Sequence, residues 1–198
     1  MGEQEEGAVH RVAYIGDSLT ASGDWEEWFP GEETLNFGVP GYTSDDVLAR
    51  LDEIVAAQPD EIIMLIGTND LGLRRSVEHL VRNVEFALVH LRRELPGVRL
   101  LLQSIMPRGA EFARDIQDAN IHLRQFCATV GAHYLDLWPT MATEDGALRP
   151  ELTDDGLHLT SAGYDAWLEE LRPGIERLRD LPPMSRPLNV VSAEEPRR

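Results

Sequence analysis

The sequence predicts a three-layer α/β/α fold built on a five-stranded parallel sheet. Short apolar runs of strand length recur along the chain, and longer amphipathic segments separate them. Strands that alternate with helices form a parallel sheet, because each right-handed crossover lays its helix on one face of the sheet. The 198 residues are the size of one domain, and 42% of them are hydrophobic, which is enough for a packed core.

Five runs rich in Val, Ile, Leu and Met are the expected strands, at residues 11–15, 34–37, 61–66, 98–105 and 133–137. In the segments between these runs, apolar residues recur at the spacing of a helix. Ser76 precedes an apolar stripe that ends at Pro96-Gly97, and the residues of a capping box at 43–46 precede a stripe that starts at Val47. Two more helices are expected over residues 112–130 and 161–178.

We expect residues 1–181 to form a single domain and residues 182–198 to be a flexible C-terminal tail. The tail is rich in proline and has few large apolar side chains. Residues 1–10 are polar and acidic, unlike a targeting segment, so we expect a cytoplasmic protein. The apolar runs are far shorter than the ~20 residues that span a bilayer, and we expect no stable membrane insertion.

The charged residues exclude several function classes. All 18 basic residues are arginine, against 35 acidic ones, and the net charge is −17. The absence of lysine excludes Schiff-base chemistry, the phosphate-loop lysine and the Ser-x-x-Lys pair. The acidic excess argues against a nucleic-acid partner and a polybasic membrane patch. The single cysteine, Cys127, excludes an internal disulfide and a multi-cysteine zinc site, and we expect neither a metal nor a cofactor.

Polar, glycine-rich segments follow the first three expected strands. They are Gly-Asp-Ser-Leu-Thr at 16–20, Gly-Val-Pro-Gly at 38–41 and Gly-Thr-Asn-Asp at 67–70. Ligands of an open parallel sheet bind beyond the carboxyl ends of its strands, which is where these segments lie. A fourth polar segment, at 154–160, contains His158 and directly precedes the last expected helix.

These segments contain the parts of a hydrolytic site. The Ser18 hydroxyl is a weak nucleophile until a base removes its proton, and His158 is the natural base. Asp155, three residues earlier, can fix the imidazole tautomer. The backbone N–H groups of Ser18 and Gly41 and the side-chain amide of Asn69 can stabilise a developing oxyanion.

The same segments resemble the GDSL, or SGNH, hydrolase family. The matching motifs are Gly-Asp-Ser-Leu near the N-terminus, Gly-Thr-Asn-Asp after the third strand and Asp-Gly-Leu-His near the C-terminus. The resemblance implies a flavodoxin-like SGNH hydrolase fold, with Ser18, Gly41, Asn69 and His158 as the four named positions and Asp155 as the third member of the triad. It also implies a small-molecule ester as substrate.

Within this family the chain is most similar to the platelet-activating-factor acetylhydrolase catalytic-subunit-like branch. Residues 36–44, 106–109 and 155–164 carry the similarity. It implies a serine esterase for short acyl groups, acetyl in particular, and a possible homodimer. The chain departs from the branch at Pro40-Gly41-Tyr42, where Gly-Gly-Asp is more usual, and the tyrosine is expected to reshape the substrate rim.

Other side chains are candidates for substrate contact. We expect Tyr42 at the rim and Arg108 at the mouth of the site. Apolar walls are expected from Leu19, Leu71, Met106 and Leu157. Trp25, Trp28 and Phe29 are expected to pack in the core.

Several alternatives stay open at this point. The same residues suit a lysophospholipase, a thioesterase or an acyltransferase. A different class is a non-catalytic flavodoxin-like binding module, in which Ser18 only caps a helix and His158 is structural. Asn69 and Asp70 are also typical turn residues, and Asp154 is the rival of Asp155.

Overall fold

A computed structural model describes residues 9–181, and the tail expected at 182–198 lies outside this range. Five parallel strands form one sheet in the order β2-β1-β3-β4-β5. Their bounds are β1 (Arg11–Gly16), β2 (Glu33–Gly38), β3 (Glu61–Leu65), β4 (Arg99–Gln103) and β5 (His133–Leu135). The predicted fold class is confirmed.

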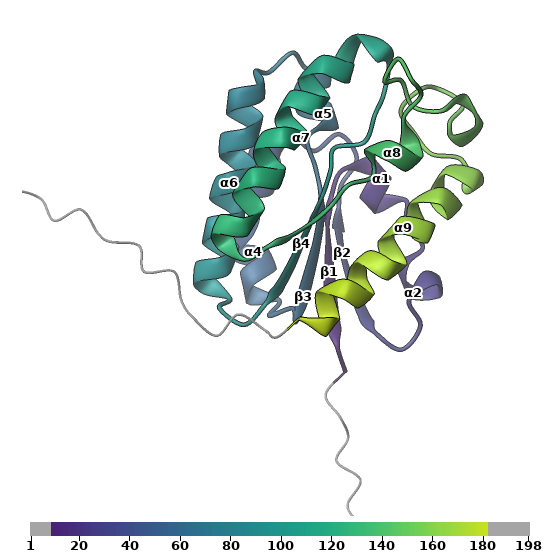
Figure 1. The fold of residues 1–198 in the computed structure, drawn as a ribbon. Helices are drawn as coiled ribbons and strands as arrows, with labels where there is room; N and C mark the ends of the chain where they lie inside the picture. Colours follow the sequence, from purple (N-terminus) through teal and green to yellow (C-terminus); the bar gives the residue numbers. More distant parts are fainter. Residues whose placement is uncertain (1–8, 182–198) are drawn as a thin grey trace, which may run out of the picture.

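Helices cover both faces of the sheet (Figure 1). One face carries α3 (Ser44–Ala49), α4 (Leu51–Ala56), α6 (Val77–Glu94) and α7 (Ala113–Cys127). The other carries α1 (Ser18–Ala21), α2 (Trp25–Trp28), α8 (Trp138–Met141) and α9 (Ser161–Asp180). The short α5 (Thr68–Gly72) follows β3, and three 3₁₀ turns lie at Ala110–Phe112, Ala128–Val130 and Pro150–Leu152.

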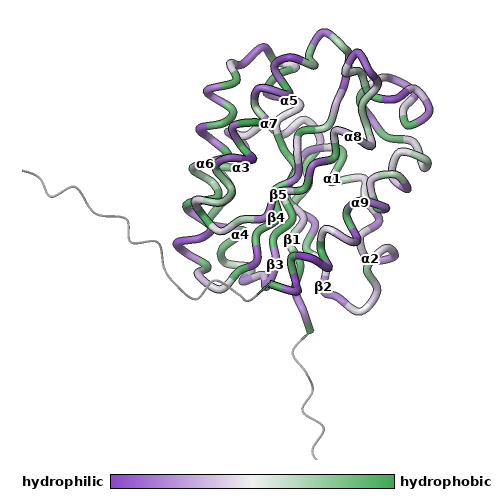
Figure 2. Tube along the Cα trace, in the orientation of Figure 1, coloured by the Kyte–Doolittle hydropathy of each residue, from purple (hydrophilic) through white to green (hydrophobic). Residues whose placement is uncertain are grey.

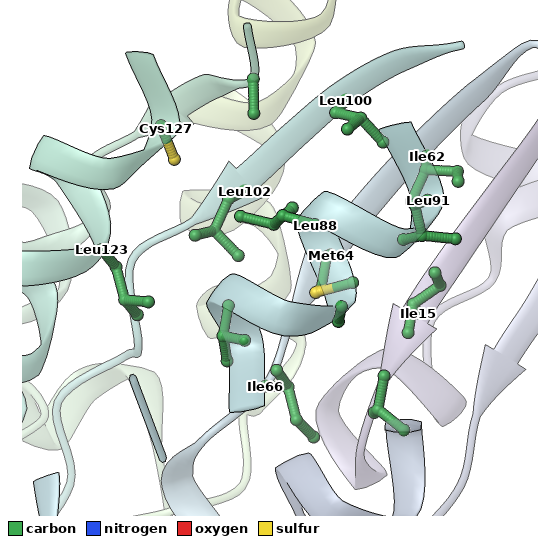
Figure 3. Packing of buried hydrophobic residues seen from close by; sticks show 14 of the residues in the cluster. Ile15, Ile62, Met64, Ile66, Leu88, Leu91, Leu100, Leu102, Leu123 and Cys127 are labelled. Carbon is green, nitrogen blue, oxygen red and sulfur yellow. The ribbon is translucent and has the colours of Figure 1, made fainter. Parts of the chain in front are cut away.

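The two faces of the sheet form two separate apolar clusters. Alternation along β3 sends Ile62 and Met64 toward α6 and sends Ile63 and Leu65 toward α9. Figure 3 shows the α6 side, where Leu88 lies among side chains of the central strands. In Figure 2 the strands are largely hydrophobic along their length, whereas the outer helices alternate in hydropathy. The central strands β1, β3 and β4 are therefore buried on both faces, whereas the edge strand β2 is partly exposed.

Two elements differ from expectation. The strand expected to reach residue 105 ends at Gln103, because the Asn120 side chain bonds both the N–H and the carbonyl of Ile105, at 2.8 and 3.0 Å. The helix expected after residue 46 is divided at Arg50, whose backbone leaves the helical conformation at φ = −113° and ψ = 8°. Within residues 9–181, none of the helices combines the length and apolar character needed to span a bilayer.

Candidate active site

Ser18 begins α1 directly after the carboxyl end of β1. The Asp17 carboxylate caps this helix by accepting a hydrogen bond from the Leu19 N–H at 3.0 Å. The alternative in which Ser18 caps the helix is therefore wrong. Its hydroxyl instead lies 3.2 Å from Nε2 of His158. Burial raises the pKa of the neighbouring Asp17 to about 6.

Asp155 holds His158 in place through three hydrogen bonds. One oxygen lies 2.7 Å from His158 Nδ1, and the other accepts the N–H groups of His158 and Leu157 at 2.7 and 2.9 Å. The hydrogen bond to the His158 side chain has the largest effect on the pKa of Asp155, and the two backbone donors have smaller effects. Together they hold this pKa well below its usual range. Asp154, the rival candidate, is exposed and takes no part in these bonds.

Thr153, which no sequence motif indicated, organises the loop that carries this pair. Its hydroxyl donates to the His158 carbonyl at 2.7 Å and accepts the N–H of Gly156 at 3.0 Å. Gly156 has φ = +78°, a conformation that favours glycine. The available signal was a threonine shortly before Asp-Gly, because Ser and Thr side chains often bond the backbone of such a turn.

The expected oxyanion donors come from the ends of three strands that lie side by side. Ser18 follows β1, Gly41 follows the neighbouring β2, and Asn69 follows β3 on the other side of β1. Gly41 has φ = +82°, and a side chain there would meet no atom within 4 Å. Glycine is therefore favoured at this position by backbone conformation rather than by space.

The orientation of the Asn69 amide follows from its hydrogen bond. Its Nδ2 donates to the carbonyl of Tyr42 at 2.8 Å, a contact that the amide oxygen could not make because both atoms would be acceptors. An amide nitrogen carries two N–H donors, and this hydrogen bond uses one of them. Asn69 and Asp70 lie in the helix α5 rather than in a turn.

Two glycines allow the nucleophile turn to sit close to the sheet. A Cβ on Gly38 would lie 2.3 Å from the backbone nitrogen of Ala21, and a Cβ on Gly16 would lie 2.4 Å from the carbonyl oxygen of Leu65. The hydroxyl of Tyr164 in α9 donates to the Leu19 carbonyl at 2.9 Å. The turn is thus held between the sheet and α9.

The structure places three of the expected apolar walls in the core. Leu19, Leu71 and Met106 are only 2–3% exposed and belong to the two apolar clusters. Their side chains serve packing, which corrects the expectation that they form open walls beside Ser18. Leu157 is half-buried in the loop of the histidine.

The two other expected substrate contacts also have partners within the protein. The ring of Tyr42 lies 5.7 Å from the Arg50 guanidinium and packs against the α6-side cluster. Arg108 donates to the Thr68 carbonyl at 2.9 Å and lies over the ring of Phe112. Arg108 therefore links the loops after β3 and β4.

The aromatic side chains after the nucleophile turn pack as expected. Trp25 stacks on Tyr14 with 3.9 Å between ring centroids, and Trp25 and Phe29 are buried. Cys127 is buried as well. Over the described part of the chain, no three His, Cys, Asp or Glu side chains are arranged to hold a metal ion.

Ser18, His158 and Asp155 thus bring a hydroxyl, an imidazole and a carboxylate into successive contact, an arrangement that can activate a serine as a nucleophile. About half of the His158 and Asp155 side-chain surface is exposed, so a substrate can approach them from solvent.

Comparisons with known proteins agree with this geometry. The model of the GDSL-like Lipase/Acylhydrolase family matches residues 14–166. The platelet-activating factor acetylhydrolase IB subunit alpha1 of Rattus norvegicus is 30% identical over 165 residues, which cover 77% of this chain and 69% of that protein.

Two solved structures share the fold. A GDSL-like lipase from Bacteroides thetaiotaomicron VPI-5482 has a TM-score of 0.75 and 23% identity, over 84% of this chain and 88% of that one. A variant of an acetyl xylan esterase from Geobacillus stearothermophilus has a TM-score of 0.69 and 17% identity, over 84% of this chain and 94% of that one. The chain therefore belongs to the GDSL-like lipase/acylhydrolase family and is a carboxylic ester hydrolase.

Proposed function

We propose that this protein hydrolyses short-chain esters, acetyl esters in particular, through an acyl-enzyme on Ser18. The observation that carries the proposal is the continuous contact from Ser18 Oγ to His158 Nε2, at 3.2 Å, and from His158 Nδ1 to Asp155, at 2.7 Å. A serine hydroxyl needs such a base, and the base needs such a carboxylate.

In the first half-reaction, the Ser18 hydroxyl passes its proton to His158 Nε2 as its oxygen attacks the ester carbonyl carbon. The N–H groups of Ser18 and Gly41 and the Asn69 amide stabilise the negative oxygen of the tetrahedral intermediate. His158 then gives the proton to the departing alcohol, and the acyl group stays on Ser18. In the second half-reaction, His158 takes a proton from water as its oxygen attacks the acyl carbon. His158 then returns this proton to Ser18 Oγ as the bond between Oγ and the acyl carbon breaks and the acid leaves.

Two observations support a small acyl group. Leu19, Leu71 and Met106 are committed to the core, which leaves the half-buried Leu157 as the expected apolar contact next to the triad. The names of two similar proteins, the platelet-activating factor acetylhydrolase subunit and the acetyl xylan esterase, both refer to acetyl groups.

Labelling with a fluorophosphonate probe tests the nucleophile. We expect the wild-type protein to be labelled and Ser18→Ala to stay unlabelled, with hydrolysis of p-nitrophenyl acetate at least about 10³-fold slower. Ser22→Ala is the matched control, because Ser22 is exposed at the end of the same helix α1, and it should be labelled like the wild type. Absence of wild-type labelling would refute the proposal.

A series of p-nitrophenyl esters from acetyl to dodecanoyl tests the acyl preference. We expect kcat/KM to be highest for acetyl and to decline with chain length, because few apolar side chains are free to receive a longer chain. A maximum at octanoyl or beyond would contradict the acetyl preference and leave the Ser18 mechanism in place.

A further inference from the structure

Asp70 is a buried carboxylate that contacts neither Ser18 nor His158 within the described part of the chain. The side chain is 0% exposed. One oxygen accepts the Ser44 N–H at 2.9 Å, and the other accepts the Ser44 hydroxyl at 2.6 Å and lies 3.4 Å from a nitrogen of Arg75. A buried carboxylate is costly without such partners. Both of its oxygens are committed to Ser44.

Ser44 connects Asp70 to the loop that carries Gly41. It is the first residue of α3, three positions after Gly41, and is only 2% exposed. Its hydroxyl oxygen also accepts a hydrogen bond from Asn83 of α6 at 2.9 Å. Ser44 is thus fixed from two sides, by α5 and by α6.

The strands themselves do not fix the distance between Gly41 and Asn69. These residues follow β2 and β3, and β1 lies between the two strands, so no ladder of backbone hydrogen bonds joins them. Side chains join the loops instead: Asp70 bonds Ser44, and the Asn69 amide bonds the Tyr42 carbonyl. Arg75, just after α5, also pairs with Asp45 of α3. Consecutive residues of α5 thus hold the segment that directly follows Gly41.

We infer that Asp70 is a positioning residue of the oxyanion hole. By binding Ser44, its carboxylate keeps the Gly41 and Asn69 donors at the separation that allows both to bind one oxyanion. This inference rests on the proposed function. A carboxylate suits the task because Ser44 presents two donors, and a carboxylate presents two acceptors at matching positions. An asparagine of the same size places an NH₂ group against one of these donors.

The test is the variant Asp70→Asn, which breaks the clamp without leaving a cavity. The concentration of active sites is measured by titration with the fluorophosphonate, and kcat for p-nitrophenyl acetate is calculated per active site. We expect this kcat to fall about 10- to 100-fold, since loss of one oxyanion donor lowers kcat by about 10²–10³. KM should change by less than about threefold, because the ground-state carbonyl makes little use of these donors.

Asp46→Asn is the matched control. The Asp46 carboxylate also accepts a backbone N–H and a hydroxyl, from Thr43 at 2.8 and 2.6 Å, but both residues belong to the N-terminal turn of α3. We expect kcat per site to stay within about twofold of the wild-type value, because the separation of the two loops does not depend on this clamp.

Inhibition by phenylboronic acid separates positioning from general stability. Its tetrahedral adduct with Ser18 places an oxygen in the oxyanion hole, so the inhibition constant should rise in Asp70→Asn by about the same factor as kcat falls. A partly unfolded variant would instead have fewer active sites that react with the fluorophosphonate. The sites that remain would have the wild-type kcat and the wild-type inhibition constant. Unfolding of both variants followed by circular dichroism records their stability directly.

Ser44→Ala keeps the inference testable if Asp70→Asn does not fold. It removes the hydroxyl bond and keeps the N–H bond, and we expect kcat per site to fall about 3- to 10-fold. In the double variant the two losses should not add, because both act through the same clamp. Additive losses, or Asp70→Asn with wild-type or higher kcat and wild-type inhibition, would overturn the inference. A wild-type protein that hydrolyses no ester would overturn the proposed function together with it.

Discussion

Asp17 and Ser18 are neighbours in the chain with opposite environments. Ser18 reaches His158 in a half-exposed site, whereas Asp17 is 1% exposed and makes the cap of α1. Burial raises the pKa of Asp17 to about 6, so this carboxyl binds its proton more tightly in the folded chain than in the unfolded one. Asp17 therefore contributes stability at low pH that is lost as the pH rises toward 6.

The variant Asp17→Asn should remove this pH dependence. Asparagine is an equally good helix cap and cannot ionise. Above about pH 7 we expect the free energy of unfolding to rise by about 1–3 kcal/mol, from a shift of two pKa units at about 1.4 kcal/mol each, and the gain should vanish below about pH 4. Urea unfolding at several pH values measures it.

Asp24→Asn provides the control for this experiment. Asp24 precedes α2, is exposed and makes no capping hydrogen bond through its side chain. Its replacement should leave the free energy of unfolding within about 0.5 kcal/mol at every pH. If Asp17→Asn still raised the free energy of unfolding at pH 4, the stabilisation would not come from removing the ionisation of Asp17.

The site residues that the sequence predicts are those whose chemistry is visible in a short motif. Ser18 and Asn69 follow from residue type and position after a strand, and Asp155 and His158 follow from their spacing just before the last helix. Thr153 was not predicted, although its partners are close in sequence, because a threonine hydroxyl in a loop has many possible partners. Tyr164 could not be predicted, because its hydrogen bond crosses 145 positions to Leu19.

At the scale of single elements, the C-terminal end of α6 depends on one buried arginine. Arg92 is 1% exposed and donates to four backbone carbonyls, of Pro96, Val98, Val130 and Gly131. No carboxylate pairs with it in the described chain. The guanidinium thereby joins α6 to the segment before β4 and to the turn before β5.

Replacing Arg92 should loosen these three segments together. In Arg92→Met the four carbonyls lose their donor, while the cost of burying a charge is removed, and we expect a net loss of about 2–4 kcal/mol in the free energy of unfolding. The neighbouring Arg93→Met is the control, because Arg93 is exposed and pairs only with Glu94; it should cost less than about 1 kcal/mol. Urea unfolding of both variants measures the difference, and equal losses would show that the four bonds contribute little.

Element length decides how much of the fold the sequence predicts. The long helices α6, α7 and α9 were predicted from the helical spacing of their apolar residues, and the five strands from short apolar runs. The four- and five-residue helices α2, α5 and α8 were not predicted, because a single turn shows no period. The C-terminal end of β4 depends on the Asn120 side chain, which the hydrophobic pattern of the strand does not report.

At the scale of the whole molecule, α9 is joined to the amino end of the sheet by charge. Arg179 near the end of α9 bonds both oxygens of Glu61, which is 0% exposed, and also pairs with Glu32 at 2.7 Å. The helix that follows the His158 loop is therefore held to β3 at its far end. Apart from such pairs, the chain carries a large excess of negative charge.

This excess predicts stabilisation by salt. The net charge of −17 repels itself in the folded state, and salt screens that repulsion. Between about 0.01 and 0.3 M NaCl we expect the Tm to rise by about 2–5 °C in thermal unfolding followed by circular dichroism. A constant or falling Tm would mean that ion pairs such as Arg179–Glu61 outweigh the net repulsion.

The contact between Ser18 and His158 spans 140 positions of the chain. A ribosome makes the chain from its N-terminus, so Ser18 and all five strands leave it before His158 does. Until then the proposed nucleophile has no base, and the nascent chain cannot acylate itself with passing esters. Only a chain that has been synthesised beyond the last loop of the site can therefore form the contact from Ser18 to His158.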